Sequence, residues 1–536
     1  MKLTKKQVAD FFKSERVQVI LLIIIATAVR LFQLSKETLW LDEAYTIKVV
    51  FWKSLPSIIA NVHHEAINHP PLFFIIYNVW GKIFGISEFA LISLSIISGI
   101  LFVFLMYLIV KELFNYRGVA FMSALLASFS LFHFHFSREA VQYSFFPMMI
   151  LLSIYTFLLF LKSKPEKRIT TWAIYIITTA ALFYTHYYAF MIILVQNLVF
   201  FIFWKKNSKL IKYWIVMQLI LLLLISPELS YMYTNAVRHS HGLSKTTVFI
   251  EYAGSFGYQI KDVFIKNTGE LGLVLNAFFK QSVASIVGII LSGIIALLIL
   301  GGIVLSWMRS KKENVFNIVF LLLLVFVPIL ITSISPEVYR AKGFVFTALI
   351  YSVFLVLGIR HLFKSKVVRI IVVGIILLIG IINIAHSIGN NYFFGEQEDW
   401  EGAVDFLKQP EQKAELILVE VRYTLAPFFY YYNNSILEDF FNGNFPLNSS
   451  KSDVITVNFS SETDYSKEYY RGNRLIPDLK TLNESLERTN DFWLVSSIHT
   501  KFAYPNNDIV NFIEKDFEKI SKTEFGSVDV IRYKRK

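Results

Sequence analysis

Two adjacent carboxylates, Asp42 and Glu43, follow the first long apolar run of the chain in the stretch LWLDEAYT, residues 39–46. A positioned carboxylate can take the proton of a hydroxyl as that hydroxyl attacks, which contributes about 10²–10⁴-fold in rate. Taken alone, an Asp after a Leu-Trp-Leu run is more often the N-cap of an interfacial helix. The two roles are compatible, so we expect Glu43 to begin a helix and Asp42 to be a candidate base.

Other side chains suited to chemistry gather in further breaks between apolar segments. Each has an ordinary structural interpretation. His-Pro-Pro can simply start a helix, and an adjacent Arg and Glu can form an ion pair with each other. Basic residues before a span can be headgroup anchors. Their common location makes the stronger case. The residues are His63, His64, Glu65 and His69 in the first break, His133, His135, Arg138, Glu139 and Tyr143 in HFHFSREAVQYS, His186 in YTHYY, and Glu337, Tyr339, Arg340 and Lys342 in SPEVYRAK.

The composition indicates a polytopic membrane protein. Of 536 residues, 55% are apolar, 16% aromatic and only 17% charged. The net charge of +12 comes from Lys and Arg in short runs between apolar segments, which is typical of membrane topology and excludes nucleic acid as a partner. The chain has no Cys, so it has no disulfide, thiolate metal site or Cys nucleophile. Its basic N-terminal segment leads into a retained first span, because no cleavage site follows.

Charge alternation between the apolar segments predicts the orientation. Alternate breaks hold 22 Lys and Arg against 5 acids, whereas the intervening breaks hold 11 against 10, so the first set is expected to be cytoplasmic. If residues 70–87 crossed the membrane, this alternation of charge would be lost. We therefore interpret them as a half-helix at the outer interface. Eleven spans follow, roughly 17–34, 89–110, 119–134, 145–161, 171–184, 189–204, 213–226, 284–307, 315–333, 343–359 and 368–388.

Two domains are therefore expected. Residues 1–390 form a transmembrane domain, whose first outer loop (35–88) carries interfacial helices, and residues 391–536 form an extracytoplasmic α/β domain. The pattern predicts helices over 399–409 and 506–520, strands over 415–421, 453–459, 491–497 and 525–533, and a helix or strand in APFFYYY. An odd number of spans puts the N-terminus in the cytoplasm and the C-terminal domain outside.

All the polar groups described above then lie on the outer face, over spans almost free of charge. This layout is typical of an enzyme whose substrate is anchored in the outer leaflet, whereas a transporter or flippase needs polar groups through the bundle.

The order of these motifs resembles the GT-C glycosyltransferases, specifically the protein O-mannosyltransferase and aminoarabinose-transferase-like group (glycosyltransferase family 39-like). LWLDEAYT, then HPPLFF and SREAVQYS, are similar to the first third of such enzymes, and YTHYYAF, VYRAKGFVF and DWEGAVDFL look like those of bacterial members. The resemblance covers about residues 15–410.

That resemblance implies an integral-membrane, inverting glycosyltransferase that moves one sugar from a polyprenyl-phosphate carrier to a hydroxyl of a protein, lipid or glycan. It implies Asp42 and Glu43 as the catalytic residues, with Glu43 contacting or orienting the acceptor, and Arg138 with Arg340 or Lys342 at the carrier phosphate. The further active-site candidates are His69, Glu139, Tyr143, His186 and Tyr339. The implied location is the plasma (inner) membrane of a prokaryote.

The chemistry of the residues agrees with these roles. A leaving phosphate needs guanidinium or ammonium donors in a dry site, and each is worth about 3 kcal/mol. We expect no cofactor and no metal, and a divalent cation held by Glu65 with His63, His64 or His69 is the open alternative, because the spacing is not a diagnostic ligand pattern. The functional alternatives are an oligosaccharide transferase or ligase that uses the same carrier and, less favoured, a transporter or flippase of lipid-linked sugars.

Overall fold

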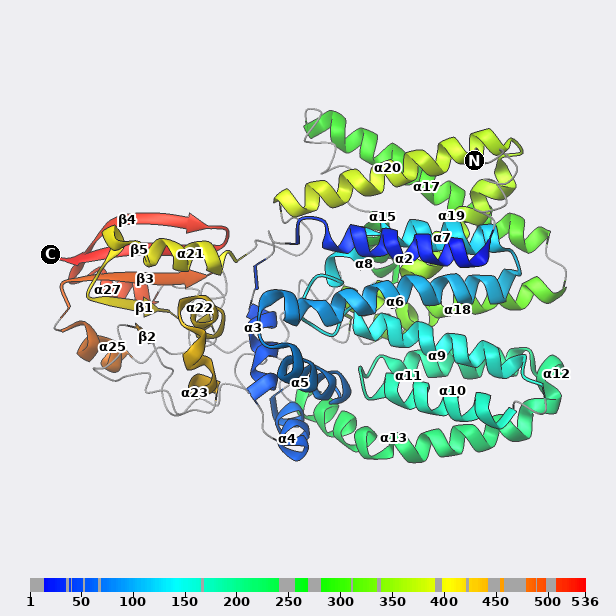
Figure 1. Cartoon of the computed structure of the whole chain (residues 1–536), viewed down its shortest axis with the longest axis horizontal. Helices are drawn as coiled ribbons and strands as arrows, with labels where there is room; N and C mark the ends of the chain where they lie inside the picture. The colour runs from blue at the N-terminus through cyan, green and yellow to red at the C-terminus, as the bar shows by residue number, and fades with distance from the viewer. Residues whose placement is uncertain are drawn as a thin grey trace, which may run out of the picture.

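The computed structural model describes residues 14–34, 38–39, 41–51, 54–65, 69–164, 168–240, 256–268, 281–309, 312–334, 339–390, 398–420, 424–441, 454–456, 479–487, 489–497 and 508–536. Long, roughly parallel helices form a bundle, and a small α/β domain lies beyond one end of it (Figure 1). The mainly helical fold with a C-terminal sheet confirms the predicted fold class.

Nine of the eleven predicted spans coincide with one helix each, whereas 119–134 is divided between α7 and α8, and 343–359 between η6 and α19. Six segments of the described chain are long and apolar enough to cross a membrane: Glu88–Phe114, Trp204–Tyr233, Ile286–Met308, Val315–Ile334, Ala341–Leu362 and Lys366–Ile388. The total of eleven spans stays a prediction. The bundle helices are α2 (Glu15–Leu31), α6 (Glu88–Phe114), α7 (Arg117–Ser128), α8 (Leu131–Phe136), α9 (Phe145–Leu161), α10 (Arg168–Phe183), α11 (Ala189–Ile202), α12 (Trp204–Asn207), η4 (Ser208–Leu210), α13 (Ile211–Ser240), α15 (Phe256–Thr268), α17 (Gln281–Met308), α18 (Lys312–Ile334), η6 (Ala341–Thr347), α19 (Ala348–Leu362) and α20 (Lys366–Asn390).

Close helix packing in the bundle depends on small residues. A Cβ on Gly302 of α17 would lie 2.0 Å from the carbonyl oxygen of Phe354, and one on Gly358 of α19 would lie 1.8 Å from that of Leu298. Membrane helices have no hydrophobic driving force between them, so close approach at glycine is a main source of their attraction. These two glycines therefore fix α19, and with it η6, against α17.

The 35–88 loop forms short helices at the end of the bundle that faces the α/β domain (Figure 1). They are α3 (Leu41–Ile47), η2 (Lys48–Phe51), α4 (Leu55–Glu65) and α5 (Leu72–Phe84). Asn78 of α5 donates to the carbonyl of Val49 at 2.6 Å, which ties α5 to η2. Residues 72–84 thus pack with the loop helices, as expected for an interfacial segment.

Beyond α20 the chain forms a five-stranded sheet of order β2-β1-β3-β5-β4. Strand β1 is parallel to β2 and β3, whereas β3, β5 and β4 run antiparallel. The elements are α21 (Trp400–Leu407), η7 (Pro410–Gln412), β1 (Leu416–Val419), α22 (Leu425–Tyr432), η9 (Asn434–Ile436), α23 (Leu437–Phe441), β2 (Val454–Thr456), α25 (Leu479–Leu486), β3 (Asp491–Ser497), α27 (Asp508–Ile513), β4 (Phe517–Phe525) and β5 (Val528–Arg535).

One predicted element of this domain is wrong in extent. The helix expected over 506–520 ends at Ile513, and Phe517–Ile520 belong to β4. Strand β4 forms a hairpin with β5 through Gly526, whose φ of 59° is the left-handed conformation that glycine adopts without strain. Pairing along this hairpin outweighs the helical spacing of FIEKDFEKI.

The α/β domain is attached to the loop helices through α22. The backbone N–H of Leu39 donates to the hydroxyl of Tyr431 at 2.7 Å, and the hydroxyl of Tyr430 donates to the carbonyl of Ile86 at 2.7 Å. Tyr431 in turn donates to the carboxylate of Glu88, the first residue of α6. The domain therefore contacts the 35–88 loop on both sides of its interfacial helices.

Candidate active site

Asp42 meets a lysine from the far end of the chain. Asp42 lies in the first turn of α3, which already includes Leu41, so it is part of the helix and does not precede it. Its Oδ2 lies 3.6 Å from Nζ of Lys342, the second residue of η6, and the two side chains are 46% and 28% exposed. A carboxylate that can accept a proton and an ammonium that can bind an anion are thus side by side and open to a ligand.

Tyr143 lies directly against this pair. Nζ of Lys342 is 4.3 Å from the centroid of its ring. Burial raises the pKa of the Tyr143 phenol, the ammonium of Lys342 opposes that rise, and the nearby carboxylates of Asp42 and Glu139 add to it. Tyr143 is therefore a neutral phenol at physiological pH. The site combines two carboxylates, one ammonium and one hydroxyl from three different loops.

The 133–144 loop supplies Arg138, Glu139 and Tyr143. Arg138 is buried, and its two terminal nitrogens donate to the carbonyls of Phe32 at 2.6 Å and Gln33 at 3.0 Å, just past the end of α2. An oxygen of Glu139 lies 2.8 Å from Nε2 of His135. These contacts do not test the predicted role of Arg138 at the phosphate. They show that its guanidinium binds two backbone carbonyls.

Glu43 points away from the open side of the site. It is buried, and its Oε1 accepts a hydrogen bond from the backbone N–H of Ala140 at 2.5 Å. The carboxylate therefore binds the 133–144 loop. Adjacent acids of one motif thus have different surroundings, since Asp42 is half-exposed and Glu43 is not.

His69 and His186 form a buried layer next to Tyr143. Their ring centroids are 5.2 Å apart, and Nε2 of His69 lies 3.0 Å from the amide nitrogen of Gln142. Burial lowers the pKa of His69 to about 3, with a further contribution from the charge of Lys342. Burial also lowers the pKa of His186 well below its usual value. Both rings are neutral at physiological pH and act as fixed polar groups.

The tautomer of His186 is set by its own loop. The backbone N–H of Tyr188 donates to Nδ1 of His186 at 3.1 Å, so the neutral ring carries its proton on Nε2. The hydroxyl of Tyr188 accepts a hydrogen bond from the backbone N–H of Arg340 at 3.0 Å. The turn between α10 and α11 thereby contacts the segment that carries Lys342.

Arg340, whose backbone N–H makes this contact, follows Tyr339 in the segment just before η6. Arg340 is exposed, and its Nη1 donates to the carbonyl of Tyr339 at 2.9 Å. The hydroxyl of Tyr339 donates to Oδ2 of Asp262 on α15 at 2.7 Å, which ties the segment just before η6 to that helix. Of the two basic residues, Lys342 is therefore the one beside Asp42, and Arg340 lies at the rim.

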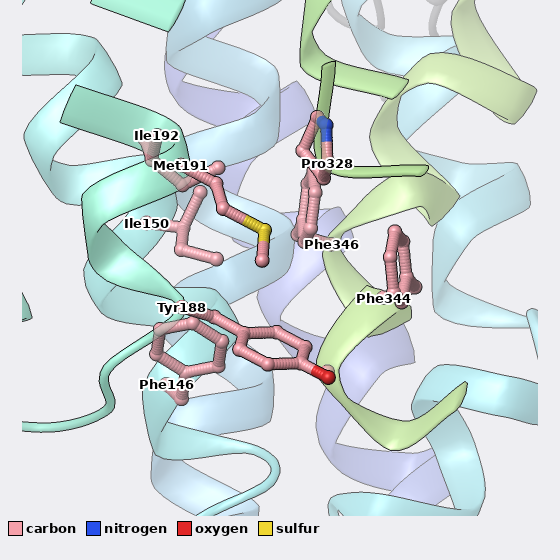
Figure 2. A pocket seen from close by; sticks show the side chains of 9 residues that line it. Phe146, Ile150, Tyr188, Met191, Ile192, Pro328, Phe344 and Phe346 are labelled. Carbon is pink, nitrogen blue, oxygen red and sulfur yellow. The ribbon is translucent and has the colours of Figure 1, made fainter. Parts of the chain in front are cut away.

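Apolar side chains beside Tyr188 and Gly343 line a narrow pocket that has no room for a water molecule. Figure 2 shows Met191 and Ile192 of α11, Pro328 of α18, and Phe344 and Phe346 of η6 around it, with the Tyr188 ring across one end. A Cβ on Gly343 would lie 2.3 Å from Cε2 of Tyr188, so glycine is needed for this close approach. These closely packed apolar side chains therefore begin one residue from Lys342 and lie between α9, α11, α18 and η6.

Glu228 is an ionisable residue near this end of the bundle that the motifs did not indicate. It is buried in α13 next to Pro227, and both its oxygens contact Nε2 of His63, at 3.2 Å and 3.1 Å. The hydroxyl of Tyr187 donates to Oε1 at 2.8 Å. A Pro-Glu pair inside an apolar run is the signal that could have located it. Its contacts tie α4, the 185–188 turn and α13 together.

The described residues include no group of three or more His, Asp or Glu that could hold a metal ion. The side chains of His64 and Glu65 lie outside the described part of the chain, so the alternative of a divalent cation there is untested. His63 and His69 have the partners given above.

Part of the chain matches a known protein family, and the whole chain resembles solved structures in fold. The model of the dolichyl-phosphate-mannose-protein mannosyltransferase family matches residues 68–231. The archaeal oligosaccharyltransferase AglB from Archaeoglobus fulgidus, in complex with an inhibitory peptide and a dolichol-phosphate, aligns with a TM-score of 0.50 at 14% identity, covering 97% of this chain and 74% of that one. A second structure of the Archaeoglobus fulgidus oligosaccharyltransferase, tethered with an acceptor peptide containing the NVT sequon, also gives 0.50, at 15% identity over 97% and 74% of the two chains.

ArnT from Cupriavidus metallidurans bound to undecaprenyl phosphate aligns with a TM-score of 0.46 at 12% identity, over 97% of this chain and 98% of that one. No curated protein sequence matches the chain.

The fold and the apolar helices define a multi-pass membrane protein. Residues 68–231 match the mannosyltransferase family, and the chain shares its fold with an archaeal oligosaccharyltransferase; both findings agree with the resemblance seen in LWLDEAYT and HPPLFF.

Proposed function

We propose that the protein is an inverting glycosyltransferase that transfers a single sugar from a polyprenyl-phosphate carrier to a hydroxyl acceptor at the outer face of a prokaryotic plasma membrane. The observation that carries this proposal is the contact of Asp42 with Lys342, at 3.6 Å. A base and a donor to an anion are two components that such a reaction requires.

Asp42 is the proposed general base. Its half-exposed carboxylate takes the proton of the acceptor hydroxyl as the oxygen attacks the anomeric carbon. The bond from that carbon to the phosphate oxygen breaks on the opposite side, so the configuration inverts and the prenyl phosphate leaves as a monoester. One glycosidic bond forms, one phosphoester bond breaks, and the proton resides on Asp42.

Lys342 is the proposed donor to the leaving phosphate. The departing oxygen gains negative charge, and an ammonium placed beside it stabilises that charge most strongly where water is limited. Lys342 is about three-quarters buried and lies against Tyr143, whereas Arg340 is at the exposed rim. The sequence leaves the choice between these two cations open, and their different exposure supports Lys342.

The apolar side chains below Gly343 are the proposed contacts of the prenyl chain of the carrier, which enters only when these side chains move apart. They are aliphatic and aromatic, with the Tyr188 hydroxyl directed toward η6 (Figure 2). Burying isoprene units against such a lining gains about 25 cal/mol for each Å² removed from water. AglB, which shares this fold, binds a dolichol-phosphate, which supports a polyprenyl carrier here.

Transfer of a preassembled oligosaccharide is the second candidate. The likeness in fold to an archaeal oligosaccharyltransferase favours it, whereas the match of residues 68–231 to mannosyltransferases favours a single sugar. The mass of the glycosylated acceptor distinguishes them, because one reaction adds one sugar and the other adds a chain.

The direct test is turnover of defined polyprenyl-phosphate sugars by the purified protein in detergent or nanodiscs. We expect Lys342→Gln to lower kcat/KM for the donor by about 10²-fold, as loss of a donor worth about 3 kcal/mol predicts. Lys364→Gln is the matched control, because Lys364 is exposed between α19 and α20. Equal activity of the two variants would contradict the assignment of Lys342.

A further inference from the structure

The 133–144 loop contacts the 35–88 loop and the end of α2 at points on either side of Asp42. From these contacts we infer that Arg138 is a positioning residue that holds Asp42 in place, and is not a ligand of the carrier phosphate. This inference rests on the proposed function, since it concerns the geometry of the base.

The first contact is made by the guanidinium of Arg138. It donates to the carbonyls of Phe32 and Gln33, at 2.6 Å and 3.0 Å, where the chain leaves α2. The last carbonyls of a helix have no partner within it, and a cation there also interacts favourably with the helix dipole. Gln33 has a φ of 51°, a left-handed conformation that is unfavourable for a residue with a side chain. The fork of Arg138 stabilises this sharp exit.

Arginine is specifically suited to this role. Its planar guanidinium can bridge two adjacent oxygens at fixed geometry, which a single lysine ammonium does less well. Arg138 is 3% exposed, and its Cζ lies 4.8 Å from the centroid of the Phe134 ring. Moving these N–H groups to a phosphate would break both hydrogen bonds and leave the turn after α2 without this support.

The second contact is made two residues later in the same loop. The backbone N–H of Ala140 donates to Glu43, the residue after Asp42, at 2.5 Å. The segment from Gln33 to Glu43 is thus held at its beginning by Arg138 and at its end by Ala140. Asp42 lies immediately before the second contact, so its position depends on both.

A third contact makes the support rigid. Nη2 of Arg30 in α2 lies 2.7 Å from Nδ1 of His133 in α8, and both residues are fully buried. Gly99 of α6 gives them room, because a Cβ there would lie 2.6 Å from Nε of Arg30. Helices α2 and α8 are therefore joined one turn below the contacts of Arg138, and a change at Arg138 is transmitted to the loop.

Steady-state kinetics of Arg138→Gln and Arg138→Lys separate the two roles. For a positioning residue we expect kcat to fall by about 10²-fold, as a displacement of about 1 Å at the base predicts, with the KM for the donor within threefold of wild type. Lysine should recover part of kcat. The control is Arg360→Gln, which removes an arginine stacked on Tyr116, 3.8 Å from Cζ to the ring centroid.

Two results would overturn the inference. One is a tenfold or larger rise in donor KM for Arg138→Gln, which indicates a phosphate ligand, and the other is unchanged kcat and KM. If the glutamine variant does not fold, Arg138→Lys is assessed by the same criteria.

A labelling experiment tests the contact without turnover. The chain has no Cys, so Thr38→Cys introduces a single thiol between the two contacts. Loss of about 1 kcal/mol of local stabilisation in an Arg138→Gln background should speed maleimide labelling about fivefold; an unchanged rate would contradict the inference. If the wild-type protein transfers no sugar while labelling still accelerates, the proposed function fails and the contact stands.

Discussion

Replacing Asp42 by Asn is the sharpest test of the proposed chemistry, because it separates activity from stability. The amide keeps the size of the side chain but cannot take a proton. Loss of a general base predicts a fall in kcat of about 10²–10⁴-fold, which is about 2.7–5.4 kcal/mol in the activation free energy. The expected change in the free energy of unfolding is much smaller.

That smaller value follows from the surroundings of Asp42. Its partner Lys342 is 3.6 Å away, but the two side chains are 46% and 28% exposed, so water screens their attraction. Such pairs contribute about 0–1 kcal/mol. We therefore expect the melting temperature in detergent to change little while transfer is lost.

The assay is single-turnover transfer of a labelled sugar from a polyprenyl-phosphate donor, alongside thermal unfolding of the same preparation. Asp405→Asn is a matched control, since Asp405 is an exposed carboxylate on α21. An Asp42→Asn protein that keeps more than about a tenth of the wild-type kcat would refute the role of base.

Three further predictions concern residues around the site. The pKa of His69 is lowered to about 3, so its neutral form stabilises the fold above pH 6.5, and that contribution is lost as the pH falls toward 3. Between pH 7 and pH 4 the free energy of unfolding should therefore fall by at most about 1.4 kcal/mol per pH unit from this group. His69→Gln should reduce that slope, measured by thermal unfolding. Gly343→Ala should displace Tyr188 and destabilise the protein by about 1–3 kcal/mol, measured by unfolding, together with a raised donor KM. Asp399, which accepts from the backbone N–H of Gly402 at 2.8 Å, caps α21; Asp399→Ala should cost the α/β domain about 1 kcal/mol in chemical denaturation without changing kcat.

Much of the bundle could be predicted because each membrane helix is a long run of apolar residues in the sequence. Predicted spans and observed helices agree closely, for example 89–110 with Glu88–Phe114 and 368–388 with Lys366–Asn390. The α/β domain was harder, because strands such as Phe517–Phe525 are mostly solvent-exposed and carry few apolar residues. Its FEKI segment fits a helix by local spacing, and only pairing with β5 identifies it as strand.

The contacts of the site were less predictable than its residues. LWLDEAYT indicated Asp42, but nothing local shows that Lys342, from the last polar break before α19, lies beside it. The partners of Arg138 are backbone carbonyls, which every residue possesses and which leave no trace in sequence. Residue type can suggest a cation for phosphate, whereas only three-dimensional structure shows which cation already has other partners.

The short 3-10 helix η6 explains how Lys342 reaches Asp42. The backbone N–H of Gly343 donates to the carbonyl of Arg340 at 2.9 Å, which closes a tight turn around Lys342. Gly343 packs on the ring of Tyr188, whose hydroxyl accepts from the N–H of Arg340. Both neighbours of the Ala341–Lys342 pair are thus fixed to the turn between α10 and α11, while the lysine side chain is directed toward α3 and Tyr143. The ammonium is therefore positioned by backbone contacts rather than by its own ion pair, so loss of that pair in Asp42→Asn should leave η6 in place.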